Sequence, residues 1–582
     1  MSLFDVLNLI GGLSLFLFGM NVMGSALEKR AGGQLKVLLG KLTGSKLAGF
    51  LTGLGVTSVI QSSSATTVMV VGFVNSGLMT LRQAIHVIMG ANVGTTVTAW
   101  LLSLAGLDGS SLFIQLLKPS SFTPILALIG IILIMAGKEK QKDTGSILLG
   151  FAVLMYGMEA MSGAVVPLRS SESFRNLLLV FSNPVLGVLV GAIFTAIIQS
   201  SSASVGVLQA LASTGAITMA SAIPIIMGQN IGTCVTAMLS SIGANTNAKR
   251  AAVVHLSFNI IGTTVMLIVF CAVRAMLHPV FLANSATAAS IALAHSVFNI
   301  VCTAILMPAS GLLEKLSIAI VPDHKAADSQ ADQMLDERLM ATPAIAVERC
   351  HVVALDMAKE SSEALNLAIE SLTTDSPAVA SRIRELEDST DRYEDRLGTY
   401  LLTLARRPMA ASDADESGRL LHLISDFERI ADHAVNILDS AEELHGKKIT
   451  LPPQALHELS TMEHAVQEIV RLSLLAFQNG DLASASRVEP LEQVIDTLKD
   501  QLRTRQIQRL QSGQCSLETG FIWTDLLTNF ERVADHCSNI AGCILEAQNK
   551  SLELHEYLDG IKSGAPAFRK DYEAYSREYA LV

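Results

Sequence analysis

Two short polar segments interrupt stretches of the chain that are otherwise apolar. They read Gln61-Ser62-Ser63-Ser64, with Thr66 following, and Gln199-Ser200-Ser201-Ser202. Consecutive polar side chains cannot all avoid lipid on one unbroken helix, and an unpaired polar group in hydrocarbon costs several kcal/mol. We therefore predict that the backbone breaks at each segment, inside the protein or at a cavity, and exposes a helix N-terminus that suits an anion. A single serine would instead favour close helix packing; two matched clusters favour a binding site.

A second pair of polar motifs follows the first at a fixed spacing. An asparagine lies 31 residues after each glutamine, in Gly90-Ala-Asn92-Val-Gly-Thr95 and Gly228-Gln-Asn230-Ile-Gly-Thr233. Neutral amide and hydroxyl oxygens suit a hard cation such as sodium. A helix kink or a hydrogen bond between helices is the alternative. We expect Asn92, Thr95, Asn230 and Thr233 to contribute to the site.

Fixed positive charge is scarce around these motifs. Arg82, just before an apolar stretch at 84–104, is the nearest basic residue. A multivalent oxyanion would therefore be held by hydroxyls, amides and backbone N–H groups, and co-transported sodium would supply both the missing charge and the driving force. Glu159 lies well inside another apolar stretch and is a candidate for cation or proton coupling, with a simple hydrogen bond near the outer boundary as the alternative.

The chain repeats itself after 138 residues. Gln61–Ala65 aligns with Gln199–Ala203, and Leu17–Met20 aligns with Met155–Met158. The segments 84–99 and 222–237 are identical at 11 of 16 positions, where composition alone would give roughly one or two. We therefore predict two membrane repeats, at about 5–104 and 145–241.

Composition separates a membrane part from a water-soluble part. Half of the residues are hydrophobic and only 16% are charged, against roughly a quarter in soluble proteins. Residues 1–320 hold 8 acidic and 16 basic side chains, whereas the remainder holds 45 and 26. The acidic soluble part argues against nucleic acid as a partner. Candidate spans, each of about 20 mostly apolar residues, are 6–27, 84–104, 121–137, 145–166, 220–241, 251–273 and 287–309.

Loop charge gives these spans an orientation. Basic residues gather in the predicted loops 28–46 and 138–144 and at Lys249-Arg250, and cytoplasmic loops carry the excess of Lys and Arg. The N-terminus is then outside and the C-terminal part inside, provided that the interrupted stretches 47–78 and 183–217 are re-entrant hairpins. The first helices of the two repeats then run in opposite directions. Inverted repeats are typical of secondary transporters, whose substrate site lies between the repeats near mid-membrane.

The membrane part resembles a known transporter family at these motifs. The paired Q-S-S-S and G-x-N-x-G-T segments, with His255-x-x-Phe258-Asn259 and His295-x-x-Phe298-Asn299, are similar to the type II sodium–phosphate cotransporter family in its bacterial form, over about residues 5–310. The resemblance implies sodium-dependent movement of inorganic phosphate, by uptake or by export. It assigns the substrate and sodium sites to Gln61, Ser62, Ser63, Ser64, Thr66, Asn92, Thr95, Gln199, Ser200, Ser201, Ser202, Asn230 and Thr233.

The C-terminal part carries a second duplication. After a predicted linker at 311–345, residues 346–550 have the spacing of long amphipathic helices, and the tail 551–582 holds no motif that we can interpret. Phe427–Ile437 and Phe530–Ile540 are identical at 8 of 11 positions. Each copy contains Glu-x-x-x-Asp, which places two carboxylates one helical turn apart. Two such helices can hold metal ions within a bundle; a solvated face with ion pairs to arginine is the alternative.

The doubled E-R-x-x-D-x-x-x-N pattern is similar to PhoU, the regulator associated with phosphate uptake and signalling, over roughly 345–550. The resemblance implies two three-helix units and a divalent or iron-type metal at Glu428, Asp432, Glu531 and Asp535. The acidic residues Glu387, Asp391, Glu492 and Asp496 precede these motifs in the same way. The predicted fold is all-α: a polytopic membrane domain, 1–310, with inverted repeats and two re-entrant hairpins, followed by a PhoU-like bundle.

These features predict a sodium-coupled carrier of inorganic phosphate in the bacterial inner membrane, with a cytoplasmic regulatory domain. The expected partners are phosphate, lipid and either a second copy of the chain or a phosphate-signalling protein. Two alternatives stay open: a phosphate sensor that recruits a signalling partner, and a carrier of another oxyanion. The sequence contains no G-x-x-x-x-G-K-[ST] loop and no evident nucleophile–base pair, so we expect neither ATP-driven transport nor an enzyme.

Overall fold

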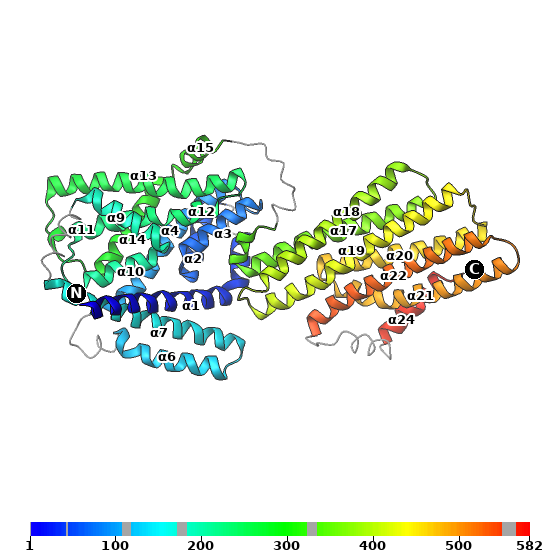
Figure 1. Ribbon diagram of the computed structural model, residues 1–582, viewed down its shortest axis with the longest axis horizontal. Coiled ribbons are helices and arrows are strands. Elements are labelled where there is room, and N and C mark those ends of the chain that lie inside the picture. The colour runs from blue at the N-terminus through cyan, green and yellow to red at the C-terminus, as the bar shows by residue number, and fades with distance from the viewer. Residues whose placement is uncertain are drawn as a thin grey trace. The chain divides into compact units, whose positions relative to one another are not determined.

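The computed structural model describes residues 2–41, 45–106, 118–170, 183–322, 335–549 and 566–581, and their regular elements are helices (Figure 1). Within these ranges extended backbone pairs at one antiparallel bridge, between Thr218 and Ser285. The chain divides into two compact units: the first is Met1–Ala346 with Arg407–Ala411, and the second is Val347–Arg406 with Ser412–Val582. The all-α prediction is confirmed.

The first unit consists of long apolar helices and short ones between them. In chain order they are α1 (Leu3–Lys41), α2 (Lys46–Ile60), α3 (Ser63–Asn75), α4 (Leu81–Ser103), η1 (Leu104–Gly106), α6 (Pro119–Ala136), α7 (Glu139–Val165), η2 (Val166–Ser170), α9 (Pro184–Ile198), α10 (Ser201–Ala212), α11 (Met219–Gly232), α12 (Cys234–Ser240), α13 (Thr246–Leu277), η3 (Val280–Ala283), α14 (Ala288–Leu306), α15 (Ser310–Ile320) and η4 (Glu337–Ala341). Two boundaries differ from the prediction. Helix α1 continues through most of the predicted loop 28–46, and α15 and η4 lie within the range predicted as a linker.

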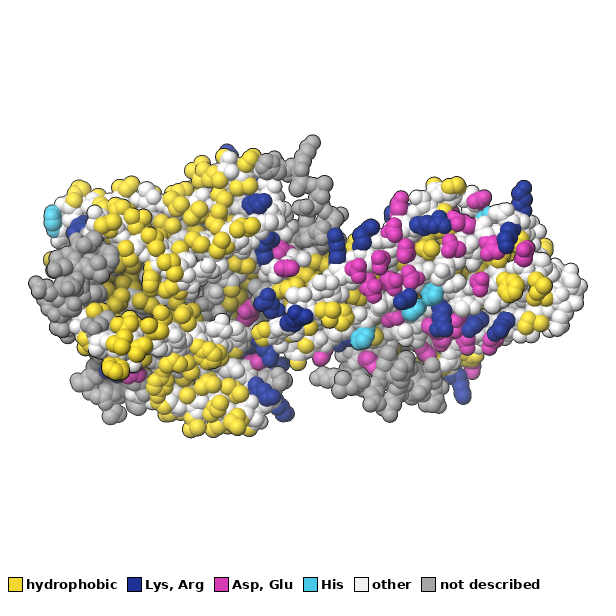
Figure 2. All heavy atoms as spheres, in the orientation of Figure 1, with side chains coloured by type: hydrophobic (Ala, Val, Ile, Leu, Met, Phe, Trp, Pro, Cys, Tyr) yellow, Lys and Arg dark blue, Asp and Glu magenta, His cyan; other side chains and the backbone are white. Residues whose placement is uncertain are grey.

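Six segments in the described part of the chain are long and apolar enough to cross a membrane: Leu3–Arg30, Leu81–Gly106, Lys140–Leu168, Met219–Ser240, Thr246–Leu277 and Ala288–Leu306. They coincide with six of the seven predicted spans, and the seventh, 121–137, is the shorter helix α6. Hydrophobic side chains dominate the surface of this unit in Figure 2. Lipid is the solvent that such a surface requires.

Helices α1 and α7, the first helices of the two repeats, pack closely in opposite directions. A Cβ at Gly12 would lie 2.8 Å from the backbone nitrogen of Met161, and one at Gly150 would lie 2.6 Å from that of Met23. Because Gly12 aligns with Gly150 and Met23 with Met161, the contact is reciprocal, as a two-fold relation requires. The residue numbers rise along α1 as they fall along α7, so the repeats are inverted as predicted.

The helix pairs α2–α3 and α9–α10, which flank the two serine segments, are named the serine hairpins here. Glycines hold each of them against the following helix of its own repeat. A Cβ at Gly90 of α4 would lie 2.0 Å from Phe50 O of α2, and one at Gly228 of α11 would lie 2.0 Å from Val188 O of α9. Neither position can accept a side chain without moving backbone. Glycine permits this close approach of two helices, and it fixes the hairpin on the helix beside it.

The second unit contains two successive three-helix groups. The first group is α17 (Pro343–Ser371), α18 (Pro377–Leu404) and α19 (Ala411–Gly446), and the second is α20 (Pro453–Asn479), α21 (Leu482–Gln511) and α22 (Leu517–Asn549). A last helix, α24 (Pro566–Glu578), packs on α21 in the range that we could not interpret from sequence. Acidic and basic side chains are mixed over the surface of this unit in Figure 2.

The two groups meet through reciprocal contacts between α19 and α22. His433 Nδ1 lies 2.9 Å from Asn529 Oδ1, and His536 Nδ1 lies 2.9 Å from Asp426 Oδ1. His433 aligns with His536 in the duplication, and Asp426 aligns with Asn529. The two imidazole rings are 5.7 Å apart. The second duplication is therefore also a pseudo-two-fold pair.

Candidate functional site

Both serine segments break their helices at the same two residues. Helix α2 ends at Ile60, Gln61 takes the left-handed conformation with φ 61°, and Ser62 is extended and caps α3 by accepting a hydrogen bond from Ala65 N–H. Gln199, with φ 58°, and Ser200 do the same between α9 and α10. A left-handed residue that ends a helix is usually glycine. The predicted breaks are confirmed. Because glutamine stands at a position where glycine is usual, we infer that its side chain has a role at the break.

The two breaks face one cavity of about 380 Å³. Both glutamines and all six serines of the two motifs line it: Gln61, Ser62, Ser63, Ser64, Gln199, Ser200, Ser201 and Ser202. Ser64 Oγ lies 3.5 Å from Gln199 O, which joins the two segments directly. The first N–H groups of a helix have no partner within the helix, and the helix dipole is positive at that end. The cavity thus combines two helix N-termini with hydroxyls and amides, which suits an oxyanion.

Helix α1 forms a wall of the cavity that sequence analysis did not include. Asn21, Ser25 and Glu28 line it, and their spacing places them on one helical face. Glu28 lies one residue beyond the predicted span 6–27, at the start of the predicted loop 28–46. None of the described lining residues is Lys or Arg. An anion in this cavity would therefore meet a carboxylate at a lining that, within the described residues, contains no Lys or Arg.

The five other predicted site residues do not line this cavity. Their side chains form hydrogen bonds within or beside their own helices: Thr66 with Thr57 Oγ1 (3.0 Å), Thr95 with Ala91 O (3.0 Å), Asn230 with Ile226 O (2.9 Å), Thr233 with Gln229 O (3.0 Å), and Asn92 with His255 Nε2 (3.4 Å). Asn92 is 4% exposed and its Nδ2 has no partner within the described residues. These contacts agree with the structural alternative named for the G-x-N-x-G-T motifs.

The H-x-x-F-N motifs of α13 and α14 are buried. In each, the asparagine amide donates to the carbonyl of its own histidine, at 3.0 Å for both Asn259 and Asn299. Asn259 Nδ2 also lies 3.3 Å from Cys234 Sγ. They stabilise their helices and the packing beside them, and neither motif lines the serine cavity.

A second cavity, of about 510 Å³, lies at the C-terminal end of α7. Glu159, Ser162 and Gly163 line it together with residues of 209–215 and 285–288. The face of α7 that it uses aligns with the face of α1 that lines the serine cavity, since Glu159 corresponds to Asn21 and Gly163 to Ser25. Because α1 and α7 are antiparallel, the two cavities lie at opposite ends of the first unit.

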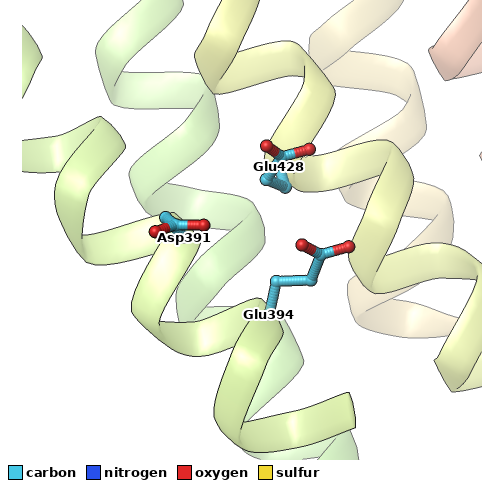
Figure 3. A group of neighbouring side chains, drawn as sticks. All are labelled: Asp391, Glu394 and Glu428. Carbon is cyan, nitrogen blue, oxygen red and sulfur yellow. The ribbon is translucent and has the colours of Figure 1, made fainter.

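In the second unit three carboxylates meet between α18 and α19. Oxygens of Asp391, Glu394 and Glu428 lie within 4.8 Å of one another, and Figure 3 shows the three side chains turned toward a common point. Burial, followed by the charge of Asp432, raises the pKa of Glu428 to about 7. Oxygen donors at such spacing suit a hard cation. Of the four predicted metal ligands, the cluster includes Glu428.

All four predicted ligands have basic neighbours, and Glu428 itself lies 3.6 Å from Arg429. Asp432 lies 3.1 Å from Arg429, Asp535 lies 3.5 Å from Arg532, and Glu531 lies 3.0 Å from Lys499. Lys499 also lies 3.7 Å from Asp496. It follows Asp496 by three residues, as Glu394 follows Asp391. The second group therefore places an ammonium where the first places a carboxylate, and its residues do not fit a bound metal.

Comparisons with known proteins agree with this division. The family model described as Na+/Pi-cotransporter matches residues 15–163 and 166–307, and the PhoU domain model matches 354–441 and 459–544. The chain is 24% identical over 563 residues to the "Putative inorganic phosphate export protein YjbB" of Salmonella typhimurium, covering 95% of this chain and 99% of that protein.

Two further relatives match shorter stretches of the chain. "Sodium-dependent phosphate transport protein 2A" of Rattus norvegicus is 44% identical over 94 residues, 15% of either chain. "Phosphate-specific transport system accessory protein PhoU homolog 1" of Thermotoga maritima is 27% identical over 205 residues, covering 35% of this chain and 87% of that one. With its apolar spans, paired serine hairpins and two matched models, the chain is a multi-pass membrane protein of the Na+/Pi-cotransporter family that carries C-terminal PhoU domains.

Proposed function

We propose that this chain couples the movement of inorganic phosphate to sodium ions, and that the serine cavity is the shared site. The observation that carries the proposal is the meeting of two helix N-termini at a cavity whose described lining holds a carboxylate and no Lys or Arg. Helix N-termini and hydroxyls bind the anion. Sodium neutralises the charge that phosphate and Glu28 would otherwise bring together, and its gradient drives the cycle.

The substrate and the coupling ion follow the names of the relatives. The Salmonella relative is named for inorganic phosphate export and the rat relative for sodium-dependent phosphate transport. A symporter is reversible, so the summed gradients of sodium and phosphate set the direction of net flux. The basic sites Lys29-Arg30, Lys138–Lys142 and Lys249-Arg250 support an inner-membrane protein whose second unit is cytoplasmic and whose serine hairpins are re-entrant.

Flux of radiolabelled phosphate in proteoliposomes that contain the full chain tests the proposal. We expect phosphate to accumulate against its gradient when sodium is higher on the opposite side, and to move only slowly when potassium replaces sodium. Equal flux in both ions would overturn sodium coupling. Competition by sulfate or a carboxylate as strong as that by phosphate would instead support a carrier of another anion.

Regulation by the PhoU domains is supported by the segment that precedes them. Asp336 Oδ2 accepts a hydrogen bond from Asn75 Nδ2 at the C-terminal end of α3 (2.6 Å), and Arg338 donates to Ile242 O (2.9 Å) and to Ser240 O. Helix α3 carries the first serine cluster at its other end. Helix α17 therefore begins directly after the segment Asp336–Arg338, which is hydrogen-bonded to α3. We infer that a movement of the PhoU domains displaces this segment and, through α3, changes the serine cavity.

The same connection supports a second candidate, a phosphate sensor. In that case phosphate at the serine cavity would change how α3 holds the segment Asp336–Arg338, and a signalling protein would read the PhoU domains. Substitutions that abolish flux but leave phosphate-dependent signalling intact would favour the sensor. Loss of signalling together with flux in a variant that still binds phosphate would favour the carrier.

A cation at Asp391, Glu394 and Glu428 is the third part of the proposal. Three convergent carboxylates repel one another unless a cation or a proton joins them, and oxygen ligands suit divalent or iron-type ions. A bound cation would tie α18 to α19 and stiffen the first three-helix group. The second group achieves the same neutralisation with Lys499.

A further inference from the structure

The two glutamines that end α2 and α9 have the same backbone conformation but opposite environments. Thr98 of α4 donates a hydrogen bond to Gln61 Oε1 at 2.8 Å, and the Gln61 amide donates to Ser58 O. Gln61 is 7% exposed. Gln199 is exposed at the cavity, and within the described residues its side chain forms no hydrogen bond.

The counterpart of Thr98 in the second repeat is a threonine whose hydroxyl does not hydrogen-bond to Gln199. The repeat offset of 138 relates Gln61 to Gln199 and Thr98 to Thr236. The hydroxyl of Thr236 is buried and has no hydrogen-bond partner in the described part of the chain. A buried hydroxyl without a partner is unfavourable, so the Thr236 hydroxyl is available for a hydrogen bond in another arrangement of the protein.

The helices that carry the two threonines also differ. Helix α4 is continuous through Thr98, whereas its counterpart is divided at Thr233 into α11 and α12, just before Thr236. The serine cavity extends along α1, and the equivalent face of α7 lines a separate cavity at the other end of the unit. In inverted-repeat carriers alternating access moves one repeat against the other around a fixed site, so a contact made by one repeat in one end state can be made by the other repeat in the opposite state.

We propose that Thr98 and Thr236 are positioning residues that hold the two glutamines in alternation. Thr98 holds Gln61 in the state described here, in which the serine segments face the cavity along α1. Thr236 takes Gln199 in the opposite state, in which the serine segments face the cavity along α7 and the cavity along α1 is closed. Each hydroxyl thus stabilises one of two states. The proposal rests on the transport function proposed above, and it identifies residues that set the balance of that cycle.

Cysteine labelling at two equivalent positions reads this balance. Ser25→Cys lies in the cavity along α1 and Gly163→Cys in the cavity along α7, and a Cβ at Gly163 meets no atom within 4 Å. Each is introduced into the full chain, in nanodiscs, after replacement of the seven native cysteines. The measured quantity is the ratio of the maleimide labelling rate at position 163 to that at position 25, without phosphate or sodium.

We expect Thr98→Val to raise this ratio and Thr236→Val to lower it, each by about fivefold, the population change for one hydrogen bond lost from one of two states. Thr98→Ser and Thr236→Ser keep the hydroxyl and should leave the ratio unchanged. Thr123→Val is the matched control, because the buried Thr123 hydroxyl bonds its own helix at Pro119 O.

Shifts in the same direction, or no shift, would overturn the proposal, since a purely structural hydroxyl has no reason to act oppositely in the two repeats. A ratio that responds to Thr236→Val only when sodium is added would also overturn it and make Thr236 a sodium ligand. Because the assay contains no phosphate, opposite shifts in a chain that fails to transport would refute the proposed function and leave the positioning role standing.

Discussion

The two serine hairpins share one backbone geometry and differ in what surrounds their glutamines. Gln61 and Gln199 both end a helix with φ near 60°, yet one is buried against Thr98 and the other is open to the cavity. Their neighbouring helices differ in the same way, one continuous and one divided. Two nearly identical motifs thus adopt two environments, as one end state of a two-state carrier built from inverted repeats would require.

The two three-helix groups of the PhoU part also share a motif and differ around it, but here the difference is one of charge. Its two groups share the E-R-x-x-D-x-x-x-N motif, but Glu394 in one is matched by Lys499 in the other. One group therefore gathers three carboxylates, and the other closes an internal ion pair. In the PhoU duplication a difference at one position, Glu394 against Lys499, changes which charges each group brings together.

The largest expected effect comes from removing the serine hydroxyls in both repeats together. Ser63→Ala with Ser201→Ala removes one lining hydroxyl from each hairpin, and a hydrogen bond to a charged group contributes about 1.5–3 kcal/mol. We expect each single change to lower the kcat/KM of phosphate flux about tenfold or more, and the pair about a hundredfold or more. Ser103→Ala, which removes a hydroxyl bonded to Trp100 O, is the control. A loss of kcat/KM in only one of the two single variants would show that the two repeats do not contribute equally to the site.

The next effect concerns the glycines that hold each hairpin. Gly90→Ala and Gly228→Ala each place a methyl group 2.0 Å from a backbone oxygen, and overpacking costs about 1–3 kcal/mol. We expect both variants to lower the melting temperature in detergent by several degrees and by similar amounts. Gly55→Ala, where a Cβ meets no atom within 4 Å, should have little effect. A large effect at one glycine alone would show that the two hairpins are not held alike.

A charge exchange tests the comparison of the PhoU groups. Glu394→Lys should weaken cation binding at the three-carboxylate cluster, lowering the affinity for Mn²⁺ about tenfold or more in equilibrium dialysis, because an ammonium replaces one ligand and repels the ion. Lys499→Glu should create a comparable site in the second group. Unchanged Mn²⁺ binding in both variants would contradict the proposal that the three-carboxylate cluster binds a cation.

The protonation of Glu428 gives an effect that depends on pH. Its pKa is raised to about 7 in the folded protein by burial, so folding favours the protonated form. Its contribution to stability is full below the ordinary glutamate pKa near 4.5 and is lost as pH rises through about 7. In EDTA, Glu428→Gln should stabilise the second unit at pH 8 by up to about 3 kcal/mol and change little at pH 4.5.

Urea unfolding followed by the fluorescence of Trp523, which is buried in the second unit, measures this difference in a Trp100→Phe background. Because the sequence holds two tryptophans, the remaining signal reports the second unit alone. Equal stabilisation at both pH values would show that the effect of the substitution is not one of protonation.

The smallest effect is expected at the segment before α17. Arg338→Ala removes the hydrogen bonds to Ser240 O and Ile242 O, so we expect phosphate flux to change by a few-fold and its response to cations added on the PhoU side to weaken. Arg82→Ala, which breaks the exposed ion pair with Glu314 (3.2 Å), should leave that response intact. Identical behaviour of the two variants would mean that the segment transmits nothing.

Much of the membrane part could be predicted because its signals are local. A run of polar residues in an apolar stretch forces a break, and the duplication showed that both breaks matter. The roles of Asn92 and Thr95 in the site stay a prediction, because a fixed spacing selects the neighbouring helix but not the face that turns toward the cavity. Glu28 was missed because α1 extends past the end of the apolar run.

In the PhoU part the motif located the acidic helices but not their partners. Glu394 and Lys499 lie outside the repeated motif, on α18 and α21, so their effect on each cluster appears only when the helices are packed. The packing of α24 could not be predicted for a similar reason. Its aromatic residues are buried by contact with α21, as Tyr575 is beneath Arg487.

The central claim is that both repeats build one site, and equilibrium binding of radiolabelled phosphate to the purified full chain tests it most directly. We predict one phosphate per chain, bound more tightly in sodium than in potassium, with affinity lowered by either Ser63→Ala or Ser201→Ala. Two phosphates per chain, one lost with each variant and neither sensitive to sodium, would contradict the account.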